Sequence, residues 1–242
     1  MKNSSKVLTF PQVAEHSIEG VFTEFLREQQ KRLKTRTYHR YEEVVGLMRH
    51  CLNCYGYHDL DNSSDIALYE RFYFQRNLEF CVIFGPEKIL PSLNNFLNYF
   101  MIRKVMASES LLQATGTVTK KLIRWLEERE YVDREQAARA SRIAIEAARE
   151  LPAAERLARL FYEYAQNHAP RHWTAELDDY FTIEKIQPGT LLLSGNSASG
   201  IVEVRVPRNI TEHCRLGWQV NLLLGKTRNG WCILETGNVY PS

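Results

Sequence analysis

Four side chains of the types that bind zinc follow one another closely: His50, Cys51, Cys54 and His58. A structural zinc site needs four thiolate or imidazole ligands, so this set has the right chemistry. The apolar residues around it recur at three- and four-residue steps, which predicts a helix with Cys51 on its apolar face. No second pair at zinc-finger spacing follows. We therefore expect two small core residues and two ordinary histidines, and no metal site.

Three aspartates come next, at Asp59, Asp61 and Asp65. A calcium loop uses carboxylates at such steps, but it also needs a glycine and a terminal glutamate at fixed offsets, and both are missing. We expect these aspartates to cap and solvate a turn. The rest of the chain has no spacing that joins a nucleophile to its base, so the sequence predicts no catalytic residue, no cofactor and no enzyme.

A run of positive charge is the clearest binding signal in the chain. Its five members, with no acid among them, are Lys31, Arg32, Lys34, Arg36 and Arg40. The run lies where two predicted amphipathic helices join, and a helix N-terminus flanked by arginine can hold a phosphate group. The alternative is a solvated helix end whose cations complement the dipole of the first helix. The sequence leaves both interpretations open.

Two further sets of residues could contact nucleic acid. A second basic cluster consists of Lys120, Lys121 and Arg124. A stacking platform for bases could be formed near the C-terminus by Trp218, Trp231 and Tyr240. A groove beside it could be lined by Arg205, Arg208, Arg215, Lys226 and Arg228. The alternative is that the tryptophans belong to a core, and nearby acids roughly offset the cations.

Helices are predicted for the first two thirds of the chain. Ser17 suits the N-cap of the first helix, and Asp133 with Gln136 forms a capping box for a later one. That later helix is expected to end before Pro152, which suits the first turn of another helix. The aromatic-rich segment Asp65–Phe84 is expected to begin as a helix and to be buried throughout.

The apolar period shortens from about 3.6 residues to two after Asp179, which predicts strands. Turn residues separate the strands, and Asn229-Gly230 is the strongest hairpin signal. The chain is therefore predicted to be α+β. A multi-helical domain is expected in residues 1–168, and a small β-barrel of the SH3 or OB type in residues 174–242. The expected linker is Asn167–Trp173, where Pro170 prevents the helix from continuing.

Three stretches of the helical part share the helix pattern of a known family: FTEFLREQQKRLKTRTYHRYEEVVGLMRHCL, FLNYF and TGTVTKKLIRWLEEREYV. Over residues 17–132 the chain resembles the SAM-like, orthogonal-bundle core-binding domain at the amino terminus of tyrosine recombinases (phage integrases). Residues 61–84 look like an insertion relative to that family. The family's catalytic arginine, lysine, His-x-x-Arg and tyrosine set is missing after Val132. The resemblance thus implies DNA clamping without strand cleavage.

Composition narrows the function less than these patterns do. The chain has 242 residues, 44% of them hydrophobic, and a net charge of +2 that cannot by itself argue for nucleic acid. No apolar run approaches the ~18 residues of a membrane span, and the first residues lack a signal-peptide core, so we expect a cytoplasmic protein. Five scattered cysteines favour reduced thiols over a disulfide framework.

The function favoured by the sequence is non-catalytic nucleic-acid binding, with DNA as the partner. The β-barrel would then add a second contact, or a docking surface for a protein partner or a second copy of the chain. The competing interpretation is a protein-interaction module in which the helices are scaffold and no nucleic acid binds.

Overall fold

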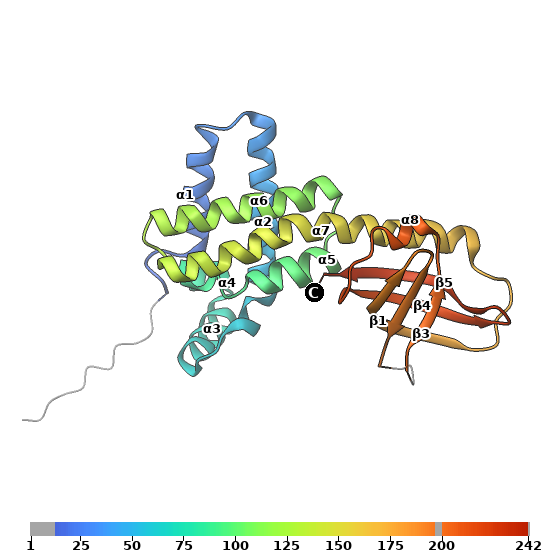
Figure 1. Cartoon of the computed structure of the whole chain (residues 1–242). Coiled ribbons are helices and arrows are strands. Elements are labelled where there is room, and N and C mark those ends of the chain that lie inside the picture. The colour runs from blue at the N-terminus through green and yellow to red at the C-terminus, as the bar shows by residue number, and fades with distance from the viewer. Residues whose placement is uncertain (1–12, 197–199, 242) are drawn as a thin grey trace, which may run out of the picture. The chain divides into compact units, whose positions relative to one another are not determined.

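The structure is a computed structural model that describes residues 13–196 and 200–241. It confirms a mixed α+β chain in which helices precede a five-stranded sheet (Figure 1). Residues 1–12 of the expected helical domain, and residues 197–199 and Ser242 of the expected barrel domain, lie outside the described residues. No helix in the part of the chain that the structure describes is long and apolar enough to cross a membrane.

The chain divides into two compact units. Unit 1 is Met1–Phe96 with Val118–Ile143, and unit 2 is Leu97–Thr117 with Ala144–Ser242. These units do not coincide with the expected domains 1–168 and 174–242. The reason lies in the core of unit 2, where Leu157 and Phe161 are buried together with the inward-facing residues of the sheet. The C-terminal part of the helix that precedes the sheet therefore contributes to the sheet's core.

Unit 1 is built around a helical hairpin. Its elements up to residue 88 are α1 (Ile18–Gln30), α2 (Thr35–Tyr55), η1 (Gly56–Asp59), α3 (Ser63–Arg76), α4 (Phe80–Ile83) and η2 (Pro86–Lys88). α1 and α2 run antiparallel and contact each other (Figure 1). Ser17 caps α1 as predicted, because its Oγ accepts a hydrogen bond from the Gly20 amide at 3.2 Å. Phe22 and Phe25 of α1 are buried, as are Val44 and Met48 of α2.

The prediction that residues 65–84 are buried throughout is wrong. Phe72 and Phe80 are buried, but Tyr73 is exposed and Phe74 is 76% exposed. Successive residues of an α-helix point about 100° apart, so Phe72, Tyr73 and Phe74 cannot all face one core. Part of the aromatic surface of α3 consequently faces solvent.

The middle of the chain contains η3 (Asn95–Phe100), α5 (Met101–Arg103), α6 (Glu109–Glu128) and α7 (Arg134–His168). The capping box is confirmed, since the Gln136 amide donates to Asp133 Oδ1 at 2.8 Å and the Asp133 amide donates to Gln136 Oε1 at 3.2 Å. The prediction of two helices meeting at Pro152 is wrong, because α7 continues through this proline. Proline removes one helical hydrogen bond, but burial of the adjacent Leu151 and Ala154 favours the continuous helix.

The sheet of unit 2 has five strands: β1 (Glu176–Gln187), β2 (Thr190–Ser194), β3 (Val202–Arg205), β4 (Gln219–Thr227) and β5 (Gly230–Tyr240). Neighbouring strands pair in the order β1-β2-β3-β5-β4, and β4 pairs back to β1. β3 and β5 are parallel and meet at Val204 and Trp231, whereas the other pairs are antiparallel. A short helix, α8 (Arg208–Thr211), lies between β3 and β4.

The hairpin predicted at Asn229-Gly230 is confirmed. β4 ends at Thr227 and β5 begins at Gly230, so Arg228 and Asn229 form a two-residue turn. Gly230 has a φ of 114°, a conformation that a residue with a Cβ rarely adopts. The turn therefore fixes the register of β4 and β5, which pair from Thr227 and Gly230 onward.

Candidate nucleic-acid interface

The four possible zinc ligands do not converge. Cys51 is buried, and burial raises the pKa of its thiol to about 12. His50, Cys54 and His58 are exposed, and Cys54 Sγ lies 3.8 Å from His50 Nε2, one helical turn away. Among the described residues no group of three or more His, Cys, Asp or Glu could hold a metal ion. Cys51 is therefore buried in the core, whereas the other three side chains are exposed.

The aspartates after α2 form a helix cap and an ion pair. Asn62 caps α3 by accepting a hydrogen bond from the Asp65 amide at 2.8 Å. Asp65 also forms an ion pair with Lys88. Partial burial alone would raise the pKa of Asp65, but the Lys88 ammonium and the Asn62 amide outweigh it and hold the pKa below its usual value. This carboxylate is thus engaged in local structure.

The basic run is at the turn between α1 and α2, which we call the hairpin tip (residues 31–36). Its four cations, all exposed, are Lys31, Arg32, Lys34 and Arg36. None of them forms an ion pair with any described residue. Arg40, the fifth basic residue of the run, differs: it lies in the second turn of α2, is half-buried and pairs with Glu43 at 2.7 Å.

The acids nearest to the hairpin tip in sequence are occupied. Glu28 accepts a hydrogen bond from the Trp125 indole N–H at 2.8 Å and pairs with Arg129. Glu42 lies 2.8 Å from His39, and Glu43 pairs with Arg40. Lys34 is the N-cap of α2 and forms no side-chain cap, so the first backbone N–H groups of this 21-residue helix have no side-chain acceptor. The hairpin tip therefore combines cations that form no ion pair with a described residue and a helix start that no side chain caps.

The second basic cluster has fewer exposed cations without ion pairs than the hairpin tip has. Lys120 is exposed and Lys121 is half-buried, whereas Arg124 pairs with Glu128 at 2.7 Å. Trp125, the next residue, packs edge to face on Phe25 of α1, with ring centroids 5.5 Å apart. The part of α6 that carries this cluster thus belongs to unit 1 and lies against the hairpin.

The expected stacking platform on the sheet is not formed. Trp218 is 2% exposed and belongs to the core of unit 2, so it cannot stack on a base. Trp231 is half-buried, and the Lys226 ammonium lies 5.0 Å from its ring centroid. The Tyr240 ring is covered by the Arg103 guanidinium, whose carbon lies 5.0 Å from the ring centroid, and Arg103 Nε donates to the Tyr240 hydroxyl at 2.8 Å.

Three of the five expected groove cations are paired with acids. Arg208 Nε lies 3.3 Å from Glu212 Oε1, and Arg205 Nε lies 3.9 Å from Glu203 Oε1. Arg215 pairs with Glu150 of α7, a carboxylate that is 7% exposed and also accepts from Arg149 at 2.8 Å. No described residue forms an ion pair with Lys226 or Arg228.

Two hollows contain residues that sequence reasoning missed. In unit 1, an aromatic hollow of about 580 Å³ is lined in part by Tyr57, Ile66, Tyr69, Tyr73 and Phe74. In unit 2, a hollow of about 610 Å³ is lined in part by Arg171, His172, Trp173, Lys226 and Arg228. Of the second hollow the sequence shows only one wall, in which Trp173 follows Arg171 by two residues within the expected linker.

Comparison of the chain with protein-family models, with curated proteins and with solved structures gave no match.

Proposed function

We propose that the protein binds nucleic acid through the hairpin tip, with duplex DNA as its partner, and that it catalyses no reaction on it. The observation that carries this proposal is the set of four exposed cations without ion pairs at Lys31, Arg32, Lys34 and Arg36. Cations held together without acids repel one another, and phosphate groups remove that repulsion.

The local backbone suits the same ligand. The positive end of the α2 dipole and its first N–H groups lie at the hairpin tip, where a phosphate oxygen can accept from them. Arginine at positions 32 and 36 can add bidentate hydrogen bonds to phosphate. Such contacts fix a protein on DNA without reading its sequence. Binding is therefore expected to depend strongly on salt and weakly on base sequence.

The resemblance to the recombinase core-binding domain supports this proposal. It implies a SAM-like helical bundle that clamps DNA, and the basic step between its first two helices corresponds to the hairpin tip. The missing recombinase catalytic set agrees with binding without cleavage.

We propose that the sheet of unit 2 is a small barrel of the OB type rather than the SH3 type. The strand order β1-β2-β3-β5-β4, the parallel pairing of β3 with β5 and the position of α8 between β3 and β4 support the OB assignment. OB barrels include many that bind oligonucleotides. A second contact to nucleic acid is consistent with this topology.

The test is a salt titration of duplex binding. Fluorescence anisotropy would give the affinity for a labelled random duplex between about 50 and 200 mM salt, for the natural chain and for Lys31→Glu, Lys34→Glu and Arg36→Glu combined. Each lost phosphate contact should reduce the slope of log K against log salt by about 0.9, so the triple variant should lose two units or more.

A matched variant separates local contacts from net charge. Arg139→Glu, Arg205→Glu and Arg208→Glu together change the charge by the same amount, but each of these arginines lies on the surface and pairs with a nearby glutamate. This control variant should retain most of the natural chain's slope of log K against log salt. Equal slopes in the natural chain and the hairpin-tip variant, with both folded by circular dichroism, would refute the proposal.

The second candidate function is protein–protein interaction, which the aromatic hollow of unit 1 favours. Tyr57 stacks on Tyr69 with ring centroids 5.8 Å apart, and Tyr69 stacks on Tyr73 at 5.1 Å, beside the exposed Phe74. Neighbouring exposed aromatic rings are typical of protein interfaces. If the natural chain binds no duplex at low salt but forms dimers in sedimentation that Phe74→Ser dissociates, this function replaces DNA binding.

A further inference from the structure

The hollow of about 610 Å³ in unit 2, which we call the linker hollow, has two walls. One wall is the segment from Pro170 to Thr174, between α7 and β1. The other is the β4–β5 turn. The walls are tied by the backbone, because the Thr174 amide donates to the Lys226 carbonyl at 2.9 Å and the Lys226 amide donates to the Ala175 carbonyl at 2.8 Å. The linker is thus held in place beside the turn.

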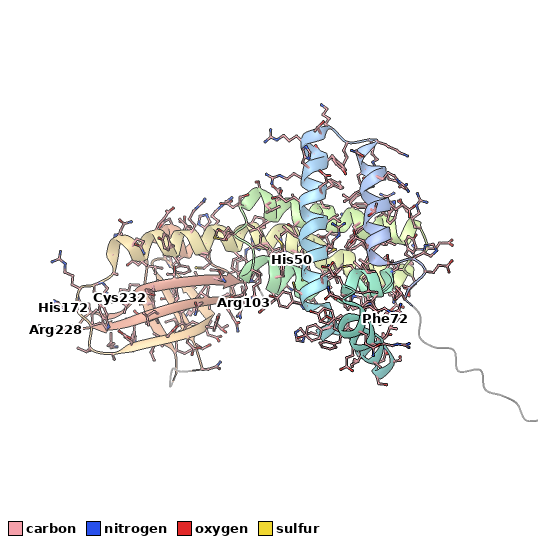
Figure 2. The ribbon with its side chains drawn as sticks, turned by 180° about the vertical axis from the view of Figure 1, so that it is seen from behind. His50, Phe72, Arg103, His172, Arg228 and Cys232 are labelled. Carbon is pink, nitrogen blue, oxygen red and sulfur yellow. The ribbon has the colours of Figure 1, made fainter. Side chains whose placement is uncertain are left out.

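The charged side chains that line the linker hollow are all basic. Arg171 comes from the linker, and Lys226 and Arg228 come from β4 and its turn. Within the described residues none of these three cations forms an ion pair, and no acid is among the residues that line the hollow. His172 and Arg228 both line this hollow, and Figure 2 labels them at the same end of the sheet. Three cations that form no ion pair with a described residue lie around one hollow, and together they outweigh the nearby carboxylate of Glu176, so the hollow favours an anionic ligand.

The hollow also contains a flat apolar surface. Trp173 is 42% exposed, and its indole N–H donates to Glu176 Oε1 at 2.6 Å, which restrains the orientation of the ring. An exposed, restrained indole beside cations offers a nucleotide both a stacking surface for its base and charge for its phosphate. The volume of the hollow, about 610 Å³, is within the range of about 300–1,000 Å³ typical of pockets for small ligands such as a nucleotide.

We propose that the linker hollow binds one nucleotide unit of a single-stranded nucleic acid, with the phosphate on Arg171, Lys226 and Arg228 and the base against Trp173. A single strand is required because the bases of a duplex are stacked on one another and their faces are covered. The inference names a second site, in a different unit from the hairpin tip, and it does not depend on duplex binding there.

The test uses the full chain, a fluorescein-labelled 12-residue oligothymidylate and anisotropy at low salt. Arg171→Glu with Arg228→Glu should weaken binding about tenfold or more and flatten the log–log salt slope by about 1.4, at about 0.7 for each contact to a single strand. Trp173→Ala should weaken binding about fivefold or more, and Trp173→Phe should retain most of the affinity because it retains a ring. Binding should also quench tryptophan fluorescence, and Trp173→Phe should lose most of this quenching.

Matched variants make the result specific. Arg205→Glu with Arg208→Glu gives the same charge change in the same unit and should alter affinity by less than about threefold, because both arginines are already paired with acids. Equal affinity of the natural chain and the Arg171/Arg228 variant, or equal losses in that variant and the matched control, would overturn the proposal. If charge reversal prevents folding, Arg171→Gln with Arg228→Gln gives the same comparison.

Two other probes separate the sources of the ligand and the two sites. Thymidine 5′-monophosphate binding as tightly as the strand, with the same loss in the linker-hollow variants, would support the site and identify a free nucleotide as its ligand. The hairpin-tip triple variant should still bind the single strand, and the linker-hollow variants should still bind duplex. Loss of duplex binding in the hairpin-tip variant therefore leaves this inference intact.

Discussion

The cations of the hairpin tip and the arginines around the sheet are similar in number but differ in their surroundings. At the tip, Lys31, Arg32, Lys34 and Arg36 are exposed and form no ion pair with a described residue. In unit 2, Arg215 pairs with the buried Glu150 and lies over the Trp218 ring at 5.1 Å. Cations of the first kind are available to a ligand, whereas cations of the second kind maintain the fold. The number of positive residues in a stretch therefore says little until the acids around them are located.

The largest expected effect on stability comes from Glu150. Replacing it with alanine removes the acceptor of Arg149 and Arg215 and leaves a space in a buried region, so unfolding should become easier by about 1–2 kcal/mol, most of it from the space, because both arginines are exposed and stay hydrated. Urea unfolding followed by circular dichroism would measure this. An effect below about 0.5 kcal/mol, the size typical of a surface site, would show that Arg215 is as free as the tip cations.

A smaller, pH-dependent effect is expected at Glu109 of α6, which pairs with Arg156 at 2.7 Å and with Arg159 at 2.9 Å. Hydrogen bonds from Arg156, together with the charge of both arginines, hold the pKa of Glu109 below its usual value despite partial desolvation. A depressed folded-state pKa stabilises the fold above the unfolded-state pKa, and this stabilisation is lost as the pH falls through the folded-state pKa.

Glu109→Gln should therefore be less stable than the natural chain near pH 7, and the difference should disappear at a pH below the folded-state pKa. Urea unfolding of both proteins across that range would measure it. A difference that persists in acid would mean that the pair contributes through packing and not through charge.

The smallest expected effect on stability belongs to the hairpin tip. Lys31→Glu, Lys34→Glu and Arg36→Glu together should change the free energy of unfolding by less than about 0.5 kcal/mol, because these exposed side chains have no partners to lose. Acids at the start of α2 also interact favourably with its dipole. If the free energy of unfolding fell by more than about 1 kcal/mol, the hairpin-tip cations would stabilise the fold as Arg215 does, and the two sets of cations would not differ in role.

Local features of the fold could be predicted from the sequence. The Ser17 cap, the Asp133–Gln136 capping box and the Asn229-Gly230 turn each depend on residues within a few positions of one another. The pairing of Arg40 with Glu43 and of Arg124 with Glu128 was also available, because residues three or four apart are neighbours on a helix.

Features that depend on distant residues could not be predicted in the same way. The burial of Trp218 is decided by which face of the strand region turns inward, and alternation alone leaves that choice open. The pair Arg215–Glu150 joins residues 65 positions apart. The linker hollow forms because residues 170–174 return to the β4–β5 turn, more than 50 positions later in the chain, as the Thr174–Lys226 hydrogen bond records. No spacing in the sequence indicates this proximity.

The burial of α7 within the sheet's core has a consequence for synthesis of the chain. Leu157, Phe161 and Ala165 leave the ribosome before any strand, at about 5–20 residues per second, so their apolar side chains stay uncovered until β5 is complete. During those seconds the nascent chain exposes an apolar helical face, the kind of surface to which chaperones bind. A fragment beginning at residue 174 would lack this face of α7, and the inward-facing residues of its strands would lose Leu157, Phe161 and Ala165 as packing partners.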